Sequence, residues 1–402
     1  MEKLKYAYAY GADAAYIGGK EFGLRAYAGN FSTGQIAEAV RLARRLRRKL
    51  YVTVNIFAHE QDLENMPAYL KTLEQLGVDG AIVSDPGVIA LAKETAPGLA
   101  LHLSTQANNT NSYTVNYWLH QGIQRVVLAR ELSQEELRQI RAKTRGELEL
   151  FVHGAMCVSY SGRCLLSHYL TGRDANRGAC TQPCRWKYAL VEEKRPGAAF
   201  PIEEDSRGSY IFNSHDLCLL PHLPELQTLG IESWKIEGRM KSLYYVAGTV
   251  KVYREGIDTL WEEGAAAYRR RLPEWQSELD KISHRAFWGG FLFGQLGEEA
   301  QNTTNSQYIR EYDFVGVSLD HASRENTAVT SDMAWVEQRN HFRQGERLEV
   351  LTPGQTPWSF EITAMLDQDR QPILAAPHAQ MQIGLPGIPP LPPFSILRRA
   401  KG

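Results

Sequence analysis

Short, mostly apolar runs alternate with amphipathic segments over the first 240 or so residues. Runs of this kind are typical of parallel strands that are covered by helices on both faces. The repeated alternation predicts an α/β region with right-handed crossovers. The runs lie at residues 13–18, 51–57, 79–85, 101–105, 125–129, 148–154 and 232–238.

The segments between the runs have helical periodicity. One of them, "SQEELRQIRAKT", begins at Ser133 and has Glu136 three residues later. This spacing is a capping box, in which the side chain of each residue accepts a hydrogen bond from the backbone N–H of the other. We therefore predict that a helix begins there.

The number of strands bears on the fold. A (β/α)8 barrel needs eight strands, and the runs supply seven. The chain opens on a helix-like segment, residues 1–12, with no strand before it. We interpret the region as a TIM-like barrel that lacks its first strand; a seven-stranded doubly wound sheet is the alternative.

The pattern changes from about Asp313 onward. Short strand-like runs separated by Gly, Pro and polar turns predict a small antiparallel β-barrel. The proline-rich tail at 385–402 is expected to be extended. The expected domains are 1–254 (barrel), 255–311 (mainly helical connector) and 312–402 (β-barrel). The expected C-terminal strands are 312–319, 326–332, 345–353, 358–366 and 379–385.

Composition narrows the class of protein. Hydrophobic residues make up 43% and charged residues 23% of the chain, as in soluble globular proteins. No apolar stretch approaches the roughly 20 residues of a membrane span, and the N-terminus lacks signal-peptide features. We expect a cytoplasmic protein, where stable disulfides are rare. The net charge of −1 gives no general attraction to nucleic acid, so only local patches matter.

Four of the five cysteines lie close together, with the spacing Cys157-x6-Cys164-x15-Cys180-x3-Cys184. They follow the run at 148–154, at the strand end where α/β barrels place chemistry. Buried thiols, a disulfide, a zinc site and an iron–sulfur cluster are all possible interpretations. Only Cys180 and Cys184 have the short spacing of a zinc knuckle.

Three blocks resemble peptidase family U-32, the collagenase-like family. They are "ELFVHGAMCVSYSGRCLLS" (149–167), "GACTQPCRW" (178–186) and "KIEGRMKS" (235–242). The similarity covers most of the chain, including the C-terminal β region. It is greatest to the bacterial branch that makes 5-hydroxyuridine at the tRNA wobble position with prephenate. Members usually begin with a strand like "ELLAPAGN", which agrees with a missing first strand here.

The resemblance implies a 4Fe–4S cluster on Cys157, Cys164, Cys180 and Cys184. Cys218, in an apolar setting that looks helical, is expected to be a packing residue. The expected function is hydroxylation of the wobble uridine at C5 with a prephenate-type co-substrate. A U-32-type peptidase and a zinc-stabilised RNA-binding protein are the alternatives.

The residues themselves are compatible with redox chemistry. No dinucleotide or Walker motif is present, so a thiolate-held cluster is the redox centre that the sequence offers. His153, four residues before Cys157, is a candidate catalytic residue and equally a candidate structural histidine. No GxSxG or HExxH motif supports a serine or zinc hydrolase.

Cationic residues near the last strand are candidate anchors for an anionic co-substrate. Lys235, Arg239 and Lys241 flank Glu237, which is a candidate for orienting Arg239 or exchanging a proton. A salt-bridged strand end is the alternative interpretation. Asn55 and Gln106, at other strand ends, are further substrate-binding candidates.

Two basic regions are candidates for contact with tRNA. In the helix predicted at 34–50, cations lie opposite Ile36, Val40 and Ala43, as a phosphate-binding stripe or a solvated face. These cations are Arg41, Arg44, Arg45, Arg48 and Lys49. Near the cysteines, Arg163 and Arg185 are interleaved with aromatic residues, a combination that suits an unstacked base. The expected partners are therefore tRNA and a small anionic co-substrate.

Overall fold

The computed structural model describes most of the chain, in two compact units. The described residues are 1–23, 30–155, 163–173, 175, 179–186, 204–205, 208–209, 215–293, 309–319 and 333–401. The first unit comprises Met1, 13–240 and 285–308; the second comprises 2–12, 241–284 and 309–402. Each unit joins segments that are distant in sequence, so the units do not correspond one to one to the predicted segments 1–254, 255–311 and 312–402.

The first unit is built on a row of seven parallel strands, in the order β1-β2-β3-β4-β5-β6-β10. All seven predicted strands are present, and the α/β class is confirmed. They are β1 (Ala14–Gly18), β2 (Lys49–Val54), β3 (Gly80–Val83), β4 (Leu101–Leu103), β5 (Arg125–Val127), β6 (Glu147–Ala155) and β10 (Ser233–Ile236).

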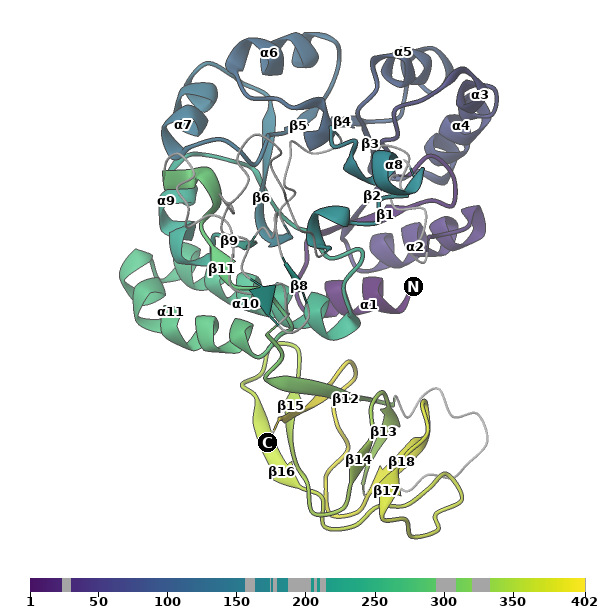
Figure 1. The fold of residues 1–402 in the computed structure, drawn as a ribbon, viewed down its shortest axis with the longest axis vertical. Coiled ribbons are helices and arrows are strands. Elements are labelled where there is room, and N and C mark those ends of the chain that lie inside the picture. The colour runs from purple at the N-terminus through teal and green to yellow at the C-terminus, as the bar shows by residue number, and fades with distance from the viewer. Residues whose placement is uncertain are drawn as a thin grey trace. The chain divides into compact units, whose positions relative to one another are not determined.

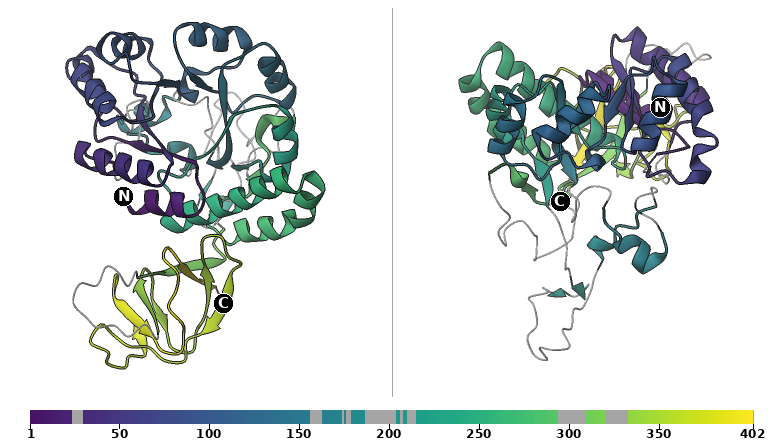
Figure 2. Two further views of the ribbon diagram at one scale, coloured as in Figure 1. Left: turned by 180° about the vertical axis from the view of Figure 1, so that it is seen from behind. Right: turned by 90° about the horizontal axis from the view of Figure 1, so that it is seen from above.

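Helices surround these strands on the outside (Figure 1; from behind, Figure 2). The capping box predicted at Ser133 is present at the start of α7. These helices are α2 (Thr33–Arg45), α3 (Glu60–Leu63), α4 (Met66–Leu76), α5 (Pro86–Thr95), α6 (Ser112–His120), α7 (Gln134–Ala142) and α9 (Leu223–Thr228). Helix α8 (Leu166–Thr171) lies apart from them (Figure 2, right). Single 3-10 turns are η1 (Thr105–Ala107), η3 (Pro183–Arg185), η4 (Leu220–His222) and η5 (Gly290–Phe293).

The row of strands curls toward closure. In the described part of the chain no ladder joins β10 to β1. The Tyr16 hydroxyl on β1 nevertheless lies 2.9 Å from Glu237 Oε2 and 3.4 Å from the Ile236 carbonyl oxygen, at the end of β10. The curled row of parallel strands agrees with the predicted TIM-like barrel, and no eighth parallel strand lies between β10 and β1 among the described residues.

A short addition extends the carboxyl end of β6. Strand β9 (Asp216–Cys218) pairs antiparallel with His153–Ala155, and β11 (Phe287–Trp288) pairs with β9. Asp216 accepts hydrogen bonds from the Arg285 guanidinium (2.8 Å), and both residues are fully buried. Cys218 is buried as predicted, but the helical setting was wrong, because this tight ion pair holds the segment as a strand. Separately, β7 (Glu204–Asp205) pairs antiparallel with β8 (Gly208–Ser209).

The second unit combines three helices with an antiparallel sheet in the order β16-β15-β19-β12-β13-β18. The antiparallel C-terminal domain is thus confirmed. The helices are α1 (Glu2–Ala9), α10 (Leu243–Glu262) and α11 (Ala265–Asp280). The sheet strands are β12 (Tyr312–Ser318), β13 (Ala334–Gln338), β15 (Arg347–Leu351), β16 (Trp358–Glu361), β18 (Gln382–Leu385) and β19 (Ile396–Ala400). A small ladder pairs β14 (Phe342–Arg343) with β17 (Ala375–Ala376).

Two features of this sheet differ from the prediction. The end of the proline-rich tail is not merely extended: β19 lies inside the sheet, between β15 and β12. Strand β13 was not predicted, and the strand expected at 326–332 lies outside the described residues. Of residues 255–311, the part up to Asp280 is helical as expected.

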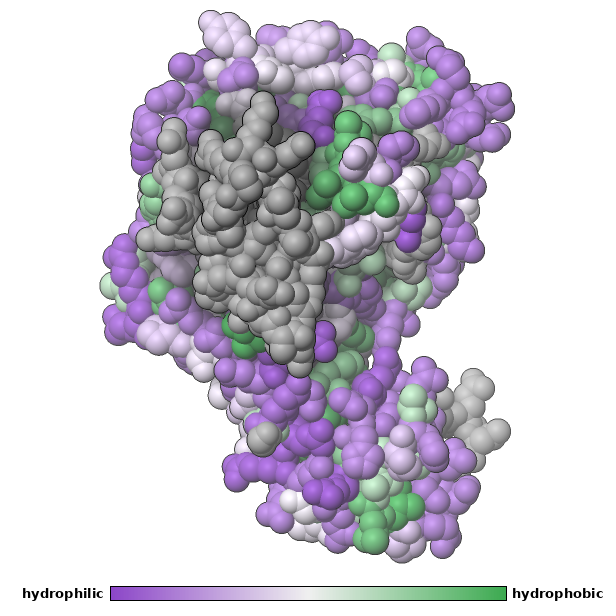
Figure 3. Space-filling model, in the orientation of Figure 1, coloured by the Kyte–Doolittle hydropathy of each residue, from purple (hydrophilic) through white to green (hydrophobic). Residues whose placement is uncertain are grey.

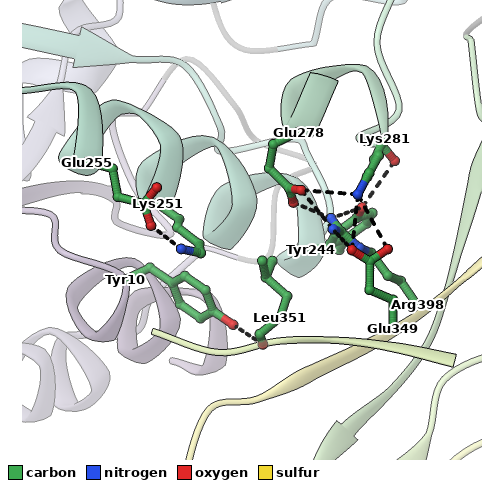
Figure 4. Close-up of polar contacts among 9 residues, drawn as sticks. All are labelled: Tyr10, Tyr244, Lys251, Glu255, Glu278, Lys281, Glu349, Leu351 and Arg398. Atoms are coloured by element: carbon green, nitrogen blue, oxygen red, sulfur yellow. Dashed lines mark hydrogen bonds and ion pairs between the residues drawn. The ribbon is translucent and has the colours of Figure 1, made fainter. Parts of the chain in front are cut away.

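Buried charges join the helices of the second unit to its sheet (Figure 4). Arg398 on β19 is fully buried and pairs with Glu278 of α11 and Glu349 of β15, at 2.8 and 2.9 Å from its Nη2. Lys281 lies 3.0 Å from Glu349, and Tyr244 OH accepts a bond from Arg398 Nη1 at 3.0 Å. Two cations thus face two carboxylates in the interior, as buried charges require.

No described helix is long and apolar enough to cross a membrane.

Candidate active site at the carboxyl ends of the barrel strands

Four polar side chains meet where the first and last strands of the row approach each other. The Tyr16 hydroxyl donates to Glu237 Oε2, and the Arg239 backbone N–H donates to Glu237 Oε1 at 3.1 Å. Arg239 Nη1 donates to Thr53 Oγ1 at 3.1 Å. Burial and the Glu237 carboxylate raise the pKa of Tyr16 well above its ordinary value, so the phenol keeps its proton. The result is a carboxylate and a guanidinium held in fixed positions.

The sequence around His153 explains how Glu237 reaches this position. Gly154 has a φ of +125°, and a Cβ there would lie 2.8 Å from the Glu237 Cβ. Only glycine tolerates both that conformation and that approach. The Glu237 backbone N–H donates to the His153 carbonyl at 2.9 Å, beyond an irregularity between Lys235 and Ile236.

A charged network fills the barrel interior below this group. Lys235 Nζ lies 2.6 Å from Glu149 Oε1 and faces the Tyr16 ring at 4.4 Å from its centroid. Ser233 and Arg125 also contact Glu149. Burial alone would raise the pKa of Glu149, but the charge and hydrogen bond of Lys235, with the other two partners, lower it overall. Lys235, predicted as a substrate anchor, is therefore placed in an internal ion pair.

His102 lies in the same interior, with its ring centroid 4.7 Å from that of Tyr51. Burial and the nearby Arg125 charge lower its pKa from 6.5 to about 4. The unfolded chain therefore takes up a proton near pH 6.5 that the folded protein takes up only near pH 4. We predict that the free energy of unfolding falls as the pH falls through this window, by up to about 1.4 kcal/mol per pH unit.

Urea titrations at several pH values between 7 and 4 measure this dependence. His102→Gln should flatten it, because the substituted side chain does not titrate. An unchanged slope in His102→Gln would show that another group is responsible.

Two predicted amides meet at the carboxyl ends of β2 and β4. Asn55 Nδ2 donates to Gln106 Oε1, and Ser104 Oγ donates to the same oxygen at 3.2 Å. Ser84 Oγ donates to the Asn55 carbonyl at 3.1 Å. Asn55 and Gln106, which the sequence predicted at strand ends of the barrel, are thus in direct contact in the structure.

The other two candidates from this region are placed differently. The His153 ring is buried and packs against Phe287 of β11, with 5.4 Å between centroids. Lys241 belongs to the second unit, where its amine lies 4.8 Å from the Tyr245 ring centroid.

The structure describes four of the five cysteines, and none of these four takes part in a disulfide. Cys164, Cys180 and Cys184 are partly exposed, and the Gln182 N–H donates to Cys180 Sγ at 3.3 Å. Cys157 lies outside the described residues.

The thiols can be tested as cluster ligands by their chemistry and their positions. Thiolates are the ligands that iron–sulfur clusters prefer. Within the ranges that the structure covers, no three His, Cys, Asp or Glu side chains converge as a metal site. The cysteine thiols are chemically suitable ligands for an iron–sulfur cluster. Binding of a cluster would require these thiols to come together around it.

The segment carrying Cys164 is exposed and both apolar and cationic. Leu165, Tyr169 and Leu170 are exposed, and apolar side chains gather over α8 on the face shown in Figure 3. The Arg163 guanidinium lies 5.4 Å from the centroid of Phe57, which follows β2. Arg163 therefore lies at the carboxyl end of the strands. For Arg185 only the backbone, in η3, is described.

The C-terminal end of the basic helix α2 lies toward the amino edge of the barrel strands, opposite the edge that carries the candidate site. Arg41 and Arg45 are exposed, and Arg48 pairs with Asp13 at 2.7 Å. Asp13 directly precedes β1, and helix ends that lead into a strand lie at the amino edge of a parallel sheet. Arg45 and Arg48 are thus remote from the site by about the length of a strand, roughly 17 Å.

Sequence reasoning missed Tyr16, Thr53, Glu149 and Arg125. Each lies within or beside a run that was read only as apolar. These residues could have been found from the pattern of their strands. Polar or aromatic side chains recur there at every second position, and alternate residues of a barrel strand face the interior.

Known proteins resemble this chain along its whole length. It is 40% identical to tRNA hydroxylation protein P1 of Bacillus subtilis, over 100% of this chain and 93% of that protein. It is 35% identical to tRNA hydroxylation protein P of Escherichia coli, over 96% and 91%. It is 39% identical to the 23S rRNA 5-hydroxycytidine C2501 synthase of E. coli, over 81% of this chain and 48% of that enzyme.

Family models agree with these relatives. The model described as peptidase family U32 matches residues 1–302, and the model of the U32 C-terminal domain matches residues 310–398. Together they span the barrel strands, the cysteine segment and the antiparallel sheet. The chain therefore belongs to peptidase family U32.

Proposed function

We propose that this protein is an enzyme that hydroxylates tRNA at C5 of the wobble uridine. The observation that carries the proposal is the 40% identity, over the entire chain, to a tRNA hydroxylation protein. A second relative is named for hydroxylation of a pyrimidine in rRNA. Hydroxylation of RNA is thus the activity that the names of these two relatives have in common.

The cofactor we propose is a 4Fe–4S cluster on Cys157, Cys164, Cys180 and Cys184. Replacing C5–H with C5–OH is a two-electron oxidation of the base, for which protein side chains have no suitable centre. A bound cluster would supply one-electron transfer at the site, and the oxygen atom and the net oxidant would come from an oxidising co-substrate. The support is the thiol chemistry of the donor set, of which Cys164, Cys180 and Cys184 are free thiols in the described structure.

The co-substrate we propose is a small anion of the prephenate type. Arg239 is the best-placed cation for it, because Thr53 and the turn at Glu237 hold it at the end of β10. Tyr16 keeps its proton and donates to Glu237, so the carboxylate stays in place as a hydrogen-bond acceptor. Lys235 is less available, because it is already paired with Glu149.

Expression in a bacterium that lacks tRNA hydroxylation tests the proposal. Mass spectrometry of nucleosides should show 5-hydroxyuridine in tRNA when this chain is supplied. Its continued absence, with soluble protein present, would contradict the proposal. Cleavage of peptides by the same protein would favour the peptidase alternative.

The two basic regions allow a matched test of tRNA contact. We predict that Arg163→Glu with Arg185→Glu weakens tRNA binding and lowers the dependence of log Kd on log salt by about one unit per lost contact. Arg41→Glu with Arg45→Glu should change both less, because Arg45 lies near the amino edge of the barrel. Filter binding at several salt concentrations measures both pairs. A larger effect from the α2 pair would place the tRNA on the opposite edge.

A further inference from the structure

Two amide side chains at the barrel mouth have unused hydrogen-bonding groups. Asn109 is 0% exposed, and neither its Oδ1 nor its Nδ2 has a partner. Gln106 is 4% exposed, and its Nε2 has no partner. Each unpaired buried group costs about 1–3 kcal/mol, and native proteins keep few of them. An apolar residue at either position would avoid this loss of stability. We therefore infer that a ligand binds there and forms hydrogen bonds with the two amides.

The orientation of Gln106 is fixed by its neighbours. Its Oε1 accepts hydrogen bonds from Asn55 Nδ2 and Ser104 Oγ. With Oε1 bonded to Asn55 Nδ2, Nε2 is the group of the Gln106 side chain that is left without a partner. Gln106 consequently presents a fixed N–H donor at the carboxyl end of β4.

The local turn brings Asn109 close to Gln106. Asn108 adopts a left-handed conformation (φ 52°) and donates from Nδ2 to the Gln106 carbonyl at 3.1 Å. The Asn109 carbonyl then accepts the Ala129 N–H at 3.1 Å, just beyond β5. Three residues of chain separate the two Cα atoms by at most about 10 Å. Both amides therefore lie at the adjoining carboxyl ends of β4 and β5.

We propose that Gln106 and Asn109 recognise the Watson–Crick edge of the substrate uracil; this inference rests on the proposed function. Uracil presents an acceptor, a donor and an acceptor: O4, N3–H and O2. Gln106 Nε2 donates to O4, Asn109 Oδ1 accepts from N3–H, and Asn109 Nδ2 donates to O2. Enzymes that act on a base outside the stack read this edge in the same way. Cytosine would place its amino group against the fixed Gln106 donor, so the pair favours uracil.

Two anticodon stem–loops that differ only in uridine or cytidine at the wobble position test the inference. The wild-type protein should bind the uridine loop about tenfold more tightly than the cytidine loop. Gln106→Glu keeps the acceptor for Asn55 and Ser104 but replaces the free donor, and Asn109→Leu removes the second amide. Both should bring the ratio of the two affinities close to one. Asn116→Leu, at an amide already bonded to the Lys143 carbonyl, should leave the ratio unchanged.

Thermal stability separates a ligand site from an internal water. Asn109→Leu should keep or raise the melting temperature, because it removes two unpaired polar atoms. A clear loss of stability, with the uridine preference intact, would mean that a structural water holds the amide and would overturn the inference. Equal binding of both loops by the wild-type protein would also overturn it. Failure of the proposed function is distinguished by a different experiment: in that case no 5-hydroxyuridine would be found in tRNA when this chain is supplied.

Discussion

Alanine in place of Cys164, Cys180 or Cys184 is expected to reduce bound iron to background and to abolish tRNA hydroxylation. A four-iron cluster on four thiolates loses one of its anchors in each variant, and the remaining ligands cannot complete its coordination. Cys157→Ala should behave in the same way. Iron and acid-labile sulfide per chain, measured after anaerobic purification, report cluster binding independently of activity.

Cys218→Ala is the matched control. Cys218 is buried in β9, where its backbone pairs with His153, so its loss should cost packing but no iron. Full iron content in any one of the four variants would remove that cysteine from the ligand set. Loss of iron in Cys218→Ala alone would show that the set itself is wrong. Zinc in place of iron would favour the zinc-stabilised alternative.

Arg398→Ala is expected to destabilise the second unit by about 3–5 kcal/mol. Arg398 is fully buried between Glu278 and Glu349, and removing it leaves two carboxylates with Lys281 as their remaining described cation. The pKa of Glu349 lies below its ordinary value. Burial alone would raise this pKa, but the hydrogen bonds and charges of Arg398 and Lys281 lower it by more than burial raises it. Urea or thermal unfolding measures the loss.

Two variants at arginines of the same sheet control this prediction. Arg398→Lys keeps the charge but not the two-pronged geometry, so it should lose part of the stability. Arg347→Ala, at an exposed arginine of β15 bonded to Ser359, should change stability by no more than about 0.5 kcal/mol. An Arg398→Ala protein as stable as the wild type would show that the buried network contributes nothing net.

The barrel strands were predictable because apolar runs in sequence are the direct signature of strands buried on both faces. Two of the strands that the sequence concealed, β9 and β19, depend on residues that are distant in the chain. In β9, Asp216 is buried only because Arg285 neutralises it from 69 residues away. In β19, Arg398 looks like a surface residue after a proline-rich stretch until its partners on α11 and β15 are known.

The candidate site divides in the same way. Polar residues at strand ends, such as Asn55, Gln106 and Glu237, were identifiable from their positions. Their hydrogen-bond partners were not, because each partner comes from another strand. Lys235 shows the consequence: its charge suggested a substrate anchor, but Glu149, which is 86 residues away, already occupies its amine.

The nucleosides of tRNA from a strain deleted for this gene test the central claim most directly. In the organism that carries this gene, deletion should remove or reduce 5-hydroxyuridine and its derivatives, and the wild-type gene should restore them while the Cys180→Ala gene should not. Unchanged 5-hydroxyuridine in the deletion strain, with no other gene for the same modification present, would contradict the account.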